Sequence, residues 1–154
     1  MIANQLKAFL DQYGIKYVSI QHSPAYSATD VAASAHVSSR NFAKTVVVKI
    51  DGKPAMVVLP ANRRLSVHDL REMLESVDVR LAAEEELRAL FPDCEIGAMP
   101  PFGNLYGLEV YVVPQLTHEE EIAFNAGTHT EVIKLAFEDF ERLVRPHVID
   151  LVTT

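Results

Sequence analysis

The sequence predicts a single α+β domain with a mixed sheet, and three observations lead to this class. The 154 residues suit one compact domain. Hydrophobic residues make up 49% of the chain and charged residues 23%, the balance of a globular protein, and no Gly/Ser-rich linker divides it. The expected helices and hairpins are interspersed and do not alternate strictly, as they would in a doubly wound fold. We therefore expect residues 1–154 to form one domain.

The first elements are predicted by apolar spacing and by capping residues. Asn4 is a candidate N-cap for an opening helix, and Gly14 supplies its left-handed stop. A short strand over residues 17–20 follows. Ser27 and Asp30 resemble a capping box that opens a helix through residue 35. The apolar residues of the opening helix are Leu6, Phe9, Leu10 and Tyr13.

A β-hairpin is the clearest structural prediction. Residues 42–50 are mostly apolar and β-branched, and residues 54–60 are apolar between two prolines. Asp51-Gly52 stands between them and favours a type I′ turn.

The second half of the chain predicts three helices and three strands. Helices are expected near residues 66–74, 83–91 and 138–144, the last ending before Pro146. In the first of them, four apolar residues are expected to be buried: Val67, Leu70, Met73 and Leu74. Strands are expected over 110–113, 122–124 and 132–135, and the last two flank a polar loop over 125–130.

The charge is unevenly distributed along the chain. The formal net charge is −7, which by itself argues against a nucleic-acid partner, since Lys and Arg drive phosphate binding. Between Arg40 and Arg71, however, seven basic residues outnumber two acidic ones, so this segment carries +5 and the remainder −12. Such an asymmetry can steer a polyanion towards one face, and a solvated hairpin kept soluble by its lysines explains it equally well.

Several classes of protein and site are disfavoured. No apolar run approaches the roughly 20 residues of a membrane-spanning helix. The N-terminus lacks the pattern of a secretory signal, and the single Cys94 excludes an internal disulfide, so we expect a cytoplasmic protein. Gly-x-Ser-x-Gly, P-loop and Gly-x-Gly-x-x-Gly motifs are missing. His118 beside three glutamates is a poor metal site, because neighbouring helical residues do not face one another. Cys94 fits a small core residue better than a nucleophile.

Three segments together resemble the YbaK/EbsC family, also called the prolyl-tRNA-synthetase-associated domain. They are Phe42–Val48 with Lys44 at a strand start, Gly97–Gly103 with a Gly-x-x-x-Pro pattern, and Phe124–Glu131 in a late loop. The resemblance runs from about residue 19 to the last helix. It implies a mixed, barrel-like sheet flanked by helices, and deacylation of mischarged aminoacyl-tRNA in trans, for example of Cys-tRNA(Pro) or Ala-tRNA(Pro). It implies no metal and no organic cofactor. The expected partner is the acceptor end of an aminoacyl-tRNA, with a synthetase as an open second partner and with no membrane or DNA.

The chemistry of this reaction explains the missing catalytic motifs. An aminoacyl ester is already activated, so the protein must mainly position water and stabilise the charge that develops on the carbonyl oxygen. The resemblance assigns the catalytic positions to Lys44, Gly97 and Pro101. Lys44 would supply a cation, and the proline loop would supply a stiff backbone. The amides of four residues in this loop remain as donors to an oxyanion: Ala98, Met99, Phe102 and Gly103.

The resemblance also indicates which residues contact the remainder of the substrate. Asn125, Gly127 and His129 would form the opposite wall, where His129 orients a water or contacts the amino acid, with a structural histidine as the alternative. Thr128 would add a hydroxyl contact or pair with the backbone. Tyr26 and Ser27 would lie at the rim. For the phosphates of the acceptor stem, the candidates are Arg40, Arg63 and Arg64, with plain surface charge as the alternative.

Two other functions remain open at this point. A module of the same fold could bind an aminoacyl-tRNA or a synthetase without turnover, as the overall acidity and the lack of an obligatory acid/base pair suggest. A hydrolase of small free esters would keep the site without the tRNA. The preferred amino acid cannot be deduced from the sequence, because one methylene in an apolar pocket changes the discrimination by only about 1–3 kcal/mol.

Overall fold

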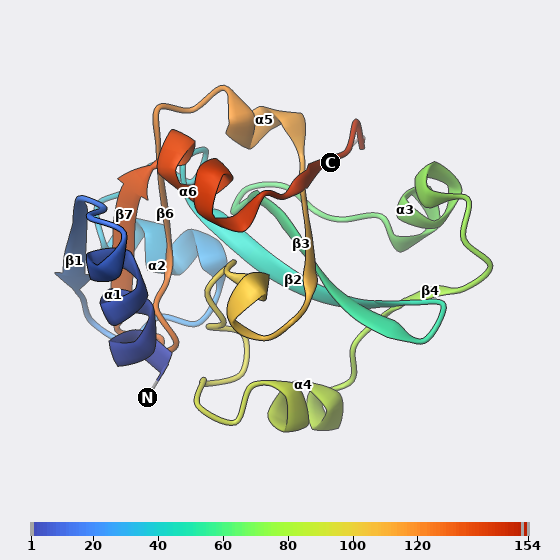
Figure 1. Cartoon of the computed structure of the whole chain (residues 1–154), viewed down its shortest axis with the longest axis horizontal. Coiled ribbons are helices and arrows are strands. Elements are labelled where there is room, and N and C mark those ends of the chain that lie inside the picture. Colours follow the sequence, from blue (N-terminus) through green and yellow to red (C-terminus); the bar gives the residue numbers. More distant parts are fainter. Residues whose placement is uncertain (1, 152, 154) are drawn as a thin grey trace.

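The computed structural model describes residues 2–151 and 153, and it shows an α+β fold of six α-helices and two sheets. This confirms the predicted class. The strands are β1 (Tyr17–Gln21), β2 (Ala43–Ile50), β3 (Lys53–Pro60), β4 (Val79–Leu81), β5 (Glu109–Val112), β6 (Glu121–Asn125), β7 (Glu131–Ala136) and β8 (His147–Val148). The helices are α1 (Ile2–Gln12), α2 (Ala28–Ser34), α3 (Val67–Leu74), α4 (Glu84–Leu90), α5 (Pro114–Thr117) and α6 (Phe137–Val144), with a 3₁₀ turn at Gly103–Leu105 (Figure 1).

The strands form one antiparallel and one mixed sheet. The first has the order β1-β7-β6, and the second has the order β4-β2-β3-β5-β8. In the second sheet the pairs β3–β5 and β5–β8 are parallel. A single parallel bridge between Phe42 and Ala123 joins the two sheets. Across the described residues the strands do not close, so the barrel-like sheet that the resemblance implied is two adjoining sheets.

Local chemistry explains where several elements begin and end. The Ser27 hydroxyl accepts a hydrogen bond from the Asp30 amide at 3.1 Å, and Ser66 caps α3 in the same way. Asp51 and Gly52 have φ values of 48° and 86°, as a type I′ hairpin turn requires. The Asp51 carboxylate also accepts from the amides of Val77 and Asp78, so it ties the hairpin tip to the chain before β4.

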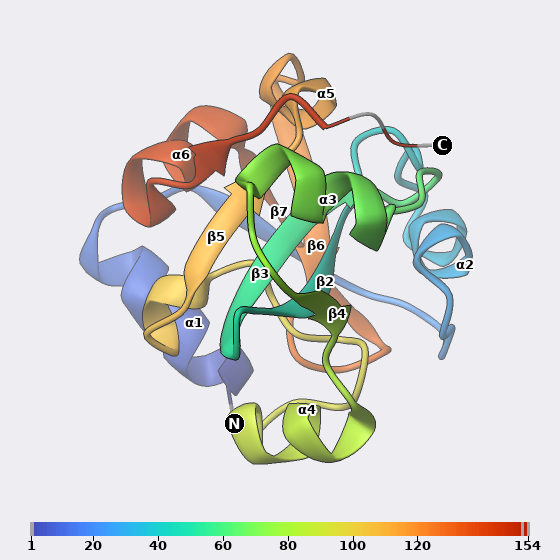
Figure 2. The ribbon, with the colours of Figure 1, turned by 90° about the vertical axis from the view of Figure 1, so that its right-hand side faces the viewer.

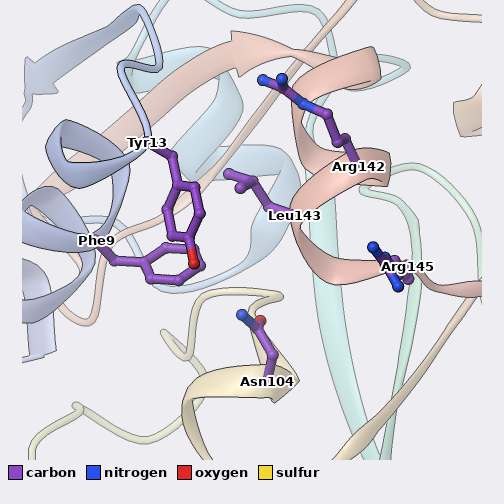
Figure 3. A pocket seen from close by; sticks show the side chains of 6 residues that line it. All are labelled: Phe9, Tyr13, Asn104, Arg142, Leu143 and Arg145. Atoms are coloured by element: carbon purple, nitrogen blue, oxygen red, sulfur yellow. The ribbon is translucent and has the colours of Figure 1, made fainter.

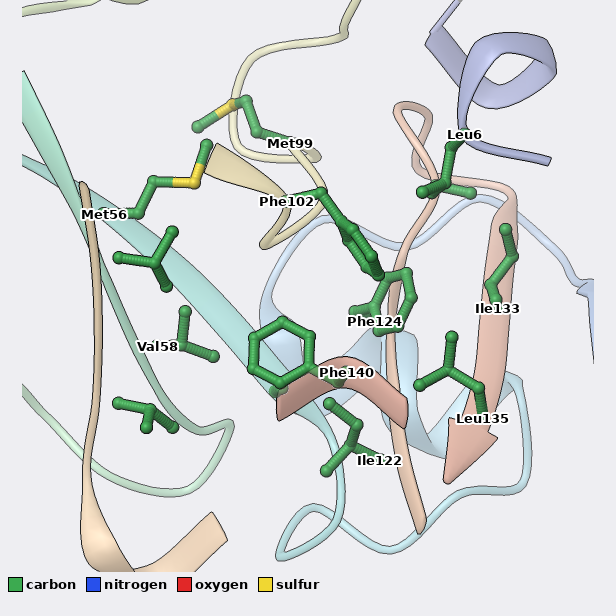
Figure 4. Packing of buried hydrophobic residues seen from close by; sticks show 14 of the residues in the cluster. Leu6, Met56, Val58, Met99, Phe102, Ile122, Phe124, Ile133, Leu135 and Phe140 are labelled. Atoms are coloured by element: carbon green, nitrogen blue, oxygen red, sulfur yellow. The ribbon is translucent and has the colours of Figure 1, made fainter. Parts of the chain in front are cut away.

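Three apolar clusters hold these layers together. The largest lies between the sheets, where Phe102, Phe124 and Phe140 are fully buried with ring centroids 5.4–5.6 Å apart (Figure 4). A second cluster lies on the outer face of β2 and β3, which α3 covers through Leu70 (Figure 2). A third lies beneath α2 and includes Phe42 and Ala123. The strands β2 and β6 therefore contribute to cores on both of their faces.

Some predicted details differ from the structure. The side chain of Met73 is 46% exposed, because it lines an open cavity with Asp69 and Glu72, and Val67 and Leu74 are only half-buried. The elements β4, β8 and α5 have two to four residues each and were not predicted. Such short elements depend on their neighbours for hydrogen bonds and lack a period of their own. None of the helices described is long and apolar enough to span a membrane.

A nearly buried carboxylate links the first helix to the sheet. Glu131, at the start of β7, is 8% exposed; its carboxylate accepts from Ser19 at 2.6 Å and pairs with Lys7 of α1. Burial raises the pKa of Glu131, but the hydrogen bonds from Lys7 and Ser19 and the charge of Lys7 outweigh it, so the pKa is lowered overall.

We predict that Glu131→Gln destabilises the fold by about 1–3 kcal/mol at pH 7, because it breaks a largely buried ion pair. A carboxyl group whose folded pKa is lowered stabilises the fold above its unfolded pKa of about 4.3. The difference between wild type and variant should therefore persist at pH 7 and shrink as the pH falls below about 4.3 towards the folded pKa.

Urea denaturation at pH 7, 5 and 4 measures this difference. Glu85→Gln is the matched control, since Glu85 is exposed and makes no ion pair within the described residues. It should change stability by less than about 1 kcal/mol. A Glu131→Gln variant as stable as this control would show that the Lys7–Glu131 pair does not hold α1 in place.

Candidate active site

Three loops that are distant in sequence meet at the end of the small sheet. His22 and Ala25 donate their amides to the carbonyls of Thr130 and His129, which joins the segment before α2 to the loop between β6 and β7. That loop is joined in turn to the segment before the proline-rich stretch. The Glu95 amide donates to the Gly127 carbonyl at 2.8 Å, and the Gly127 amide donates to the Ala98 carbonyl at 2.9 Å. The structure thus brings together the predicted residues Gly97, Ala98, Gly127 and His129.

His129 is held in one orientation with one ring nitrogen available. Its Nε2 lies 2.9 Å from the Ile96 carbonyl oxygen, which can only accept, so Nε2 carries the proton. Its Nδ1 is buried and has no partner within the described part of the chain. The ring is 4.9 Å from that of Tyr26, which is 75% exposed and covers the histidine from the solvent side. A polar atom buried without a partner is costly in a folded protein, which marks Nδ1 as an atom that a ligand can satisfy.

Lys44 and Asn125 lie on the same face of adjacent strands. Ala43 and Val47 of β2 face the core between the sheets, so Lys44 faces the other side, as Phe42 does. The parallel bridge joins Phe42 to Ala123, and two residues further along each strand are Lys44 and Asn125. Asn125 is 8% exposed, and its Oδ1 is buried with no partner among the residues described. The late loop that carries His129 begins directly after it.

The electrostatic environment of Lys44 favours its interaction with an anion. Burial lowers the pKa of the Lys44 ammonium, and the positive charge of Arg64 lowers it further. A half-buried cation that has lost part of its water shell gains more from an incoming negative charge than an exposed lysine does.

The proline-rich loop is anchored in the core beyond its first residue. Gly97 is exposed at φ 86°, and a Cβ on it would lie 3.7 Å from the His129 ring. Pro101 is buried, and the side chains of Met99 and Phe102 pack in the main core. The predicted contact of these two residues with the substrate was through their backbone amides, and it stays a prediction.

The amides of the loop are only partly available. Ala98 donates its amide to the Glu95 carbonyl at 3.0 Å, so the prediction of a free oxyanion donor there is wrong. Gly103 is required for packing, because a Cβ would lie 2.6 Å from the Leu108 carbonyl oxygen. Only the first residues of the loop, around Gly97, thus lie at the surface beside His129.

The other predicted residues lie at the edges of the site. Ser27 caps α2 with its hydroxyl, and Thr128 pairs with Thr130 at 3.2 Å between hydroxyl oxygens. Arg40 and Arg63 line one cavity of about 300 Å³, where Arg40 is already paired with Glu119. The positive charge of Arg64 instead lowers the pKa of Lys44. Of the predicted phosphate-binding arginines, Arg40 therefore precedes β2 and lines a cavity with Arg63, whereas Arg64, also after β3, is close enough to Lys44 to affect its pKa.

Glu95 organises the site, although no motif in the sequence points to it. The Glu95 carboxylate accepts a hydrogen bond from the His129 amide at 2.7 Å, while its backbone pairs with Gly127 and Ala98. Its position two residues before Gly97 is the only hint in the sequence. Within the described residues, no three His, Cys, Asp or Glu side chains gather as a metal site would require.

Comparison with known proteins shows the family. The profile of the aminoacyl-tRNA editing domain matches residues 22–143, a span that holds Lys44 and all three loops of the site. The chain belongs to this family. Editing of an aminoacyl-tRNA is hydrolysis of its ester, so the predicted family and class of enzyme are confirmed.

The relatives of this editing domain match nearly its whole length. It is 26% identical over 151 residues to the multifunctional Ser/Thr-tRNA deacylase ProXp-y of Escherichia coli (strain K12), covering 95% of this chain and 90% of that one. It is 23% identical over 145 residues to the prolyl-tRNA editing protein ProX of Acetoanaerobium sticklandii, covering 90% and 87%. The crystal structure of "a putative trans-editing enzyme for prolyl tRNA synthetase" has the same fold, with a TM-score of 0.81, 22% identity and coverage of 97% and 95%.

We predict that the site of the editing domain depends on Gly127 having no side chain. Its φ is 104°, and a Cβ would lie 2.4 Å from the side chain of Ile2 in α1. Gly127→Ala should cost about 2–4 kcal/mol of stability, from the strained backbone together with overpacking.

Gly107→Ala is the matched control, because Gly107 has φ 70° and nothing within 4 Å of its Cβ position. This variant should lose only the stability that backbone strain removes, about 1–2 kcal/mol. Urea denaturation measures the stability of both variants. Equal losses of stability would show that a Cβ on Gly127 does not clash with α1.

Proposed function

We propose that this editing domain is a trans-acting deacylase that hydrolyses the ester of mischarged aminoacyl-tRNA, with substrates of the tRNA(Pro) type. One observation carries the proposal: Asn125, whose Oδ1 is buried without a partner among the described residues, is level with the half-buried cation Lys44 on the adjoining strand. The loop that follows Asn125 carries a second atom of this kind, His129 Nδ1. Two acceptors and a cation match the needs of an aminoacyl ester.

Each group has a role in hydrolysis. The α-ammonium of the aminoacyl group is a donor, and Asn125 Oδ1 accepts from it. Water bound to His129 Nδ1 attacks the carbonyl carbon, and Lys44 stabilises the negative charge on the carbonyl oxygen of the tetrahedral intermediate. The bond from that carbon to the ribose oxygen then breaks. The water supplies a hydroxyl group to the amino acid and a proton to the ribose.

The loops select the substrate by shape. Gly97 leaves the space beside the His129 ring open, and Tyr26 covers that ring at the rim. Phe102 and Pro101 are buried, so they hold the loop and do not contact the amino acid in this proposal. The relatives differ in the amino acids and tRNA that their names specify, which agrees with a shared ester chemistry and a variable side-chain pocket.

The basic chain after β3 supplies contacts to the tRNA backbone in this proposal. Arg63 lines a cavity with Arg40, and Arg64 reaches the surroundings of Lys44, so the arginines lead from the surface to the cation. Phosphate contacts position a nucleic acid without reading its sequence. The proposal has two further parts. A synthetase delivers the mischarged product, and the domain acts in the cytoplasm, beside translation.

We predict that Lys44→Ala lowers kcat/KM for deacylation by about 100-fold or more, as loss of an oxyanion-stabilising group does. The measurement is a panel of tRNA(Pro) charged with alanine, cysteine, serine or proline, and tRNA(Ala) charged with serine or glycine. Lys53→Ala, at the exposed start of β3, is the control and should keep full activity.

The panel also separates the alternatives. Hydrolysis of one mischarged species that Lys44→Ala abolishes supports the deacylase. Full activity in Lys44→Ala would refute the assigned site. Binding of the tRNA without turnover of any species would show a binding module instead.

We predict that Arg63→Gln and Arg64→Gln weaken tRNA binding several-fold. Each should also flatten the slope of log K against log salt by about 0.7–0.9 for every phosphate that the variant no longer neutralises. Arg88→Gln on α4 is the control, because that guanidinium pairs with Glu84 on an exposed helix face. If a small aminoacyl ester is turned over as fast by both variants as by wild type, the arginines act on the tRNA. If each variant slows turnover of the small ester as much as it weakens tRNA binding, the domain does not use these arginines for tRNA.

A further inference from the structure

A second cavity of the molecule combines aromatic rings with guanidinium groups. It has a volume of about 380 Å³ and lies between the C-terminal ends of α1 and α6, with the 3₁₀ turn at its base (Figure 3). Its lining consists of Phe9, Tyr13, Asn104, Arg142, Leu143 and Arg145. This volume falls in the range of sites for small molecules, roughly 300–1,000 Å³.

The cavity is separate from the editing site. Gly127 of the late loop meets α1 at Ile2, whereas Phe9 and Tyr13 lie two to three turns further along the same helix. At about 1.5 Å per residue, Phe9 is roughly 10 Å from that contact along the helix axis. None of the cavity's lining residues was predicted to act on the substrate.

The aromatic wall is rigid and partly exposed. The rings of Phe9 and Tyr13 are 5.0 Å apart, and Phe9 packs edge-on against the buried Phe102 at 6.3 Å. Tyr13 is nevertheless 54% exposed. Figure 3 shows the two rings on one side of the cavity, opposite Leu143. An exposed ring on a fixed support is a platform on which a planar base can stack.

The charge of the cavity is positive in an acidic protein. The chain carries −7, yet this cavity is lined by two arginines and by no Asp or Glu. Arg142 pairs with Asp139 at 3.0 Å, while Arg145 makes no ion pair among the described residues. By contrast, a cavity beside α3 is lined by Asp69, Glu72 and Asp150 and would repel an anion. Guanidinium groups bind phosphate by two parallel hydrogen bonds.

We propose that this cavity binds a nucleotide unit, with its base stacked on Tyr13 and its phosphate held by Arg145 and Arg142. Asn104 lies at the base of the cavity, and its amide offers both a donor and an acceptor to the edge of the base. The unit is either a free mononucleotide or one nucleotide of a single-stranded RNA, since both present the same base and phosphate. This inference does not rest on the proposed deacylation.

The experiment is a titration of the ¹⁵N-labelled protein, followed through the backbone amides. The probes are AMP, adenosine, inorganic phosphate and a single-stranded RNA pentamer. We expect AMP or the pentamer to shift the amides of Phe9, Tyr13, Asn104, Leu143 and Arg145 saturably. Adenosine and phosphate, which each lack half of the ligand, should bind at least about tenfold more weakly.

Variants then test the assigned contacts. Arg145→Gln and Tyr13→Leu should each weaken binding by about tenfold, because each removes one half of the recognition. Arg88→Gln should leave it unchanged, and so should Lys44→Ala, which separates this cavity from the editing site. Urea denaturation confirms that the variants are folded.

The outcomes are distinct. Tight binding of AMP itself assigns the cavity to a free nucleotide, and binding of the pentamer alone assigns it to RNA. Shifts confined to residues outside the cavity overturn the proposal. So do shifts at the cavity that Arg145→Gln leaves at full strength, or the absence of saturable binding by either probe.

Discussion

The close approach of the β6–β7 loop to two other segments is the constraint on which the site depends. Gly127 occupies a place where α1, Cys94 and the chain before Gly97 converge, and its backbone hydrogen bonds run to both Glu95 and Ala98. The Glu95 carboxylate adds a bond to the His129 amide, and the Ile96 carbonyl orients the ring. The loop is therefore held by backbone and carboxylate contacts, and these leave the buried His129 Nδ1 without a partner among the described residues.

The packing of the core holds the proline-rich loop in place. The proline-rich loop leaves the site at Gly97 and enters the core at Met99 and Phe102, where Phe102 contacts rings from both β6 and α6. Glu131 and Lys7 hold α1 against the start of β7, next to the late loop. Preorganised groups of this kind need no rearrangement as charge develops on a substrate, which is the main source of electrostatic stabilisation in enzymes.

The distribution of charge reconciles an acidic protein with a polyanionic substrate. Most acidic residues lie outside the segment Arg40–Arg71, which includes Lys44, Arg63 and Arg64 and carries +5 in a chain of −7. Arg40 contributes less than the other arginines to this positive charge, because it is paired with Glu119. The lowered pKa of Lys44 has burial as its main cause, and the same burial strengthens its attraction for a developing negative charge.

Local chemistry in the sequence was sufficient to predict five of the six helices and the hairpin, although α1 begins at Ile2, before the predicted cap Asn4, and the four-residue α5 was missed. Ser27, Ser66 and the Asp51-Gly52 turn act on residues at most three positions away or, in the turn, on the two strands they join, so their roles can be deduced without the fold. The family segments likewise predicted Lys44, Gly97 and His129 as site residues; the family profile spans all three, and their roles stay predictions. Tertiary structure alone decided which segments meet. The separation into two sheets, the role of Glu95, the burial of Phe102 and the cavity between α1 and α6 all arise from contacts between residues far apart in the chain. Such contacts depend on the packing of whole elements, which no local pattern of residues encodes.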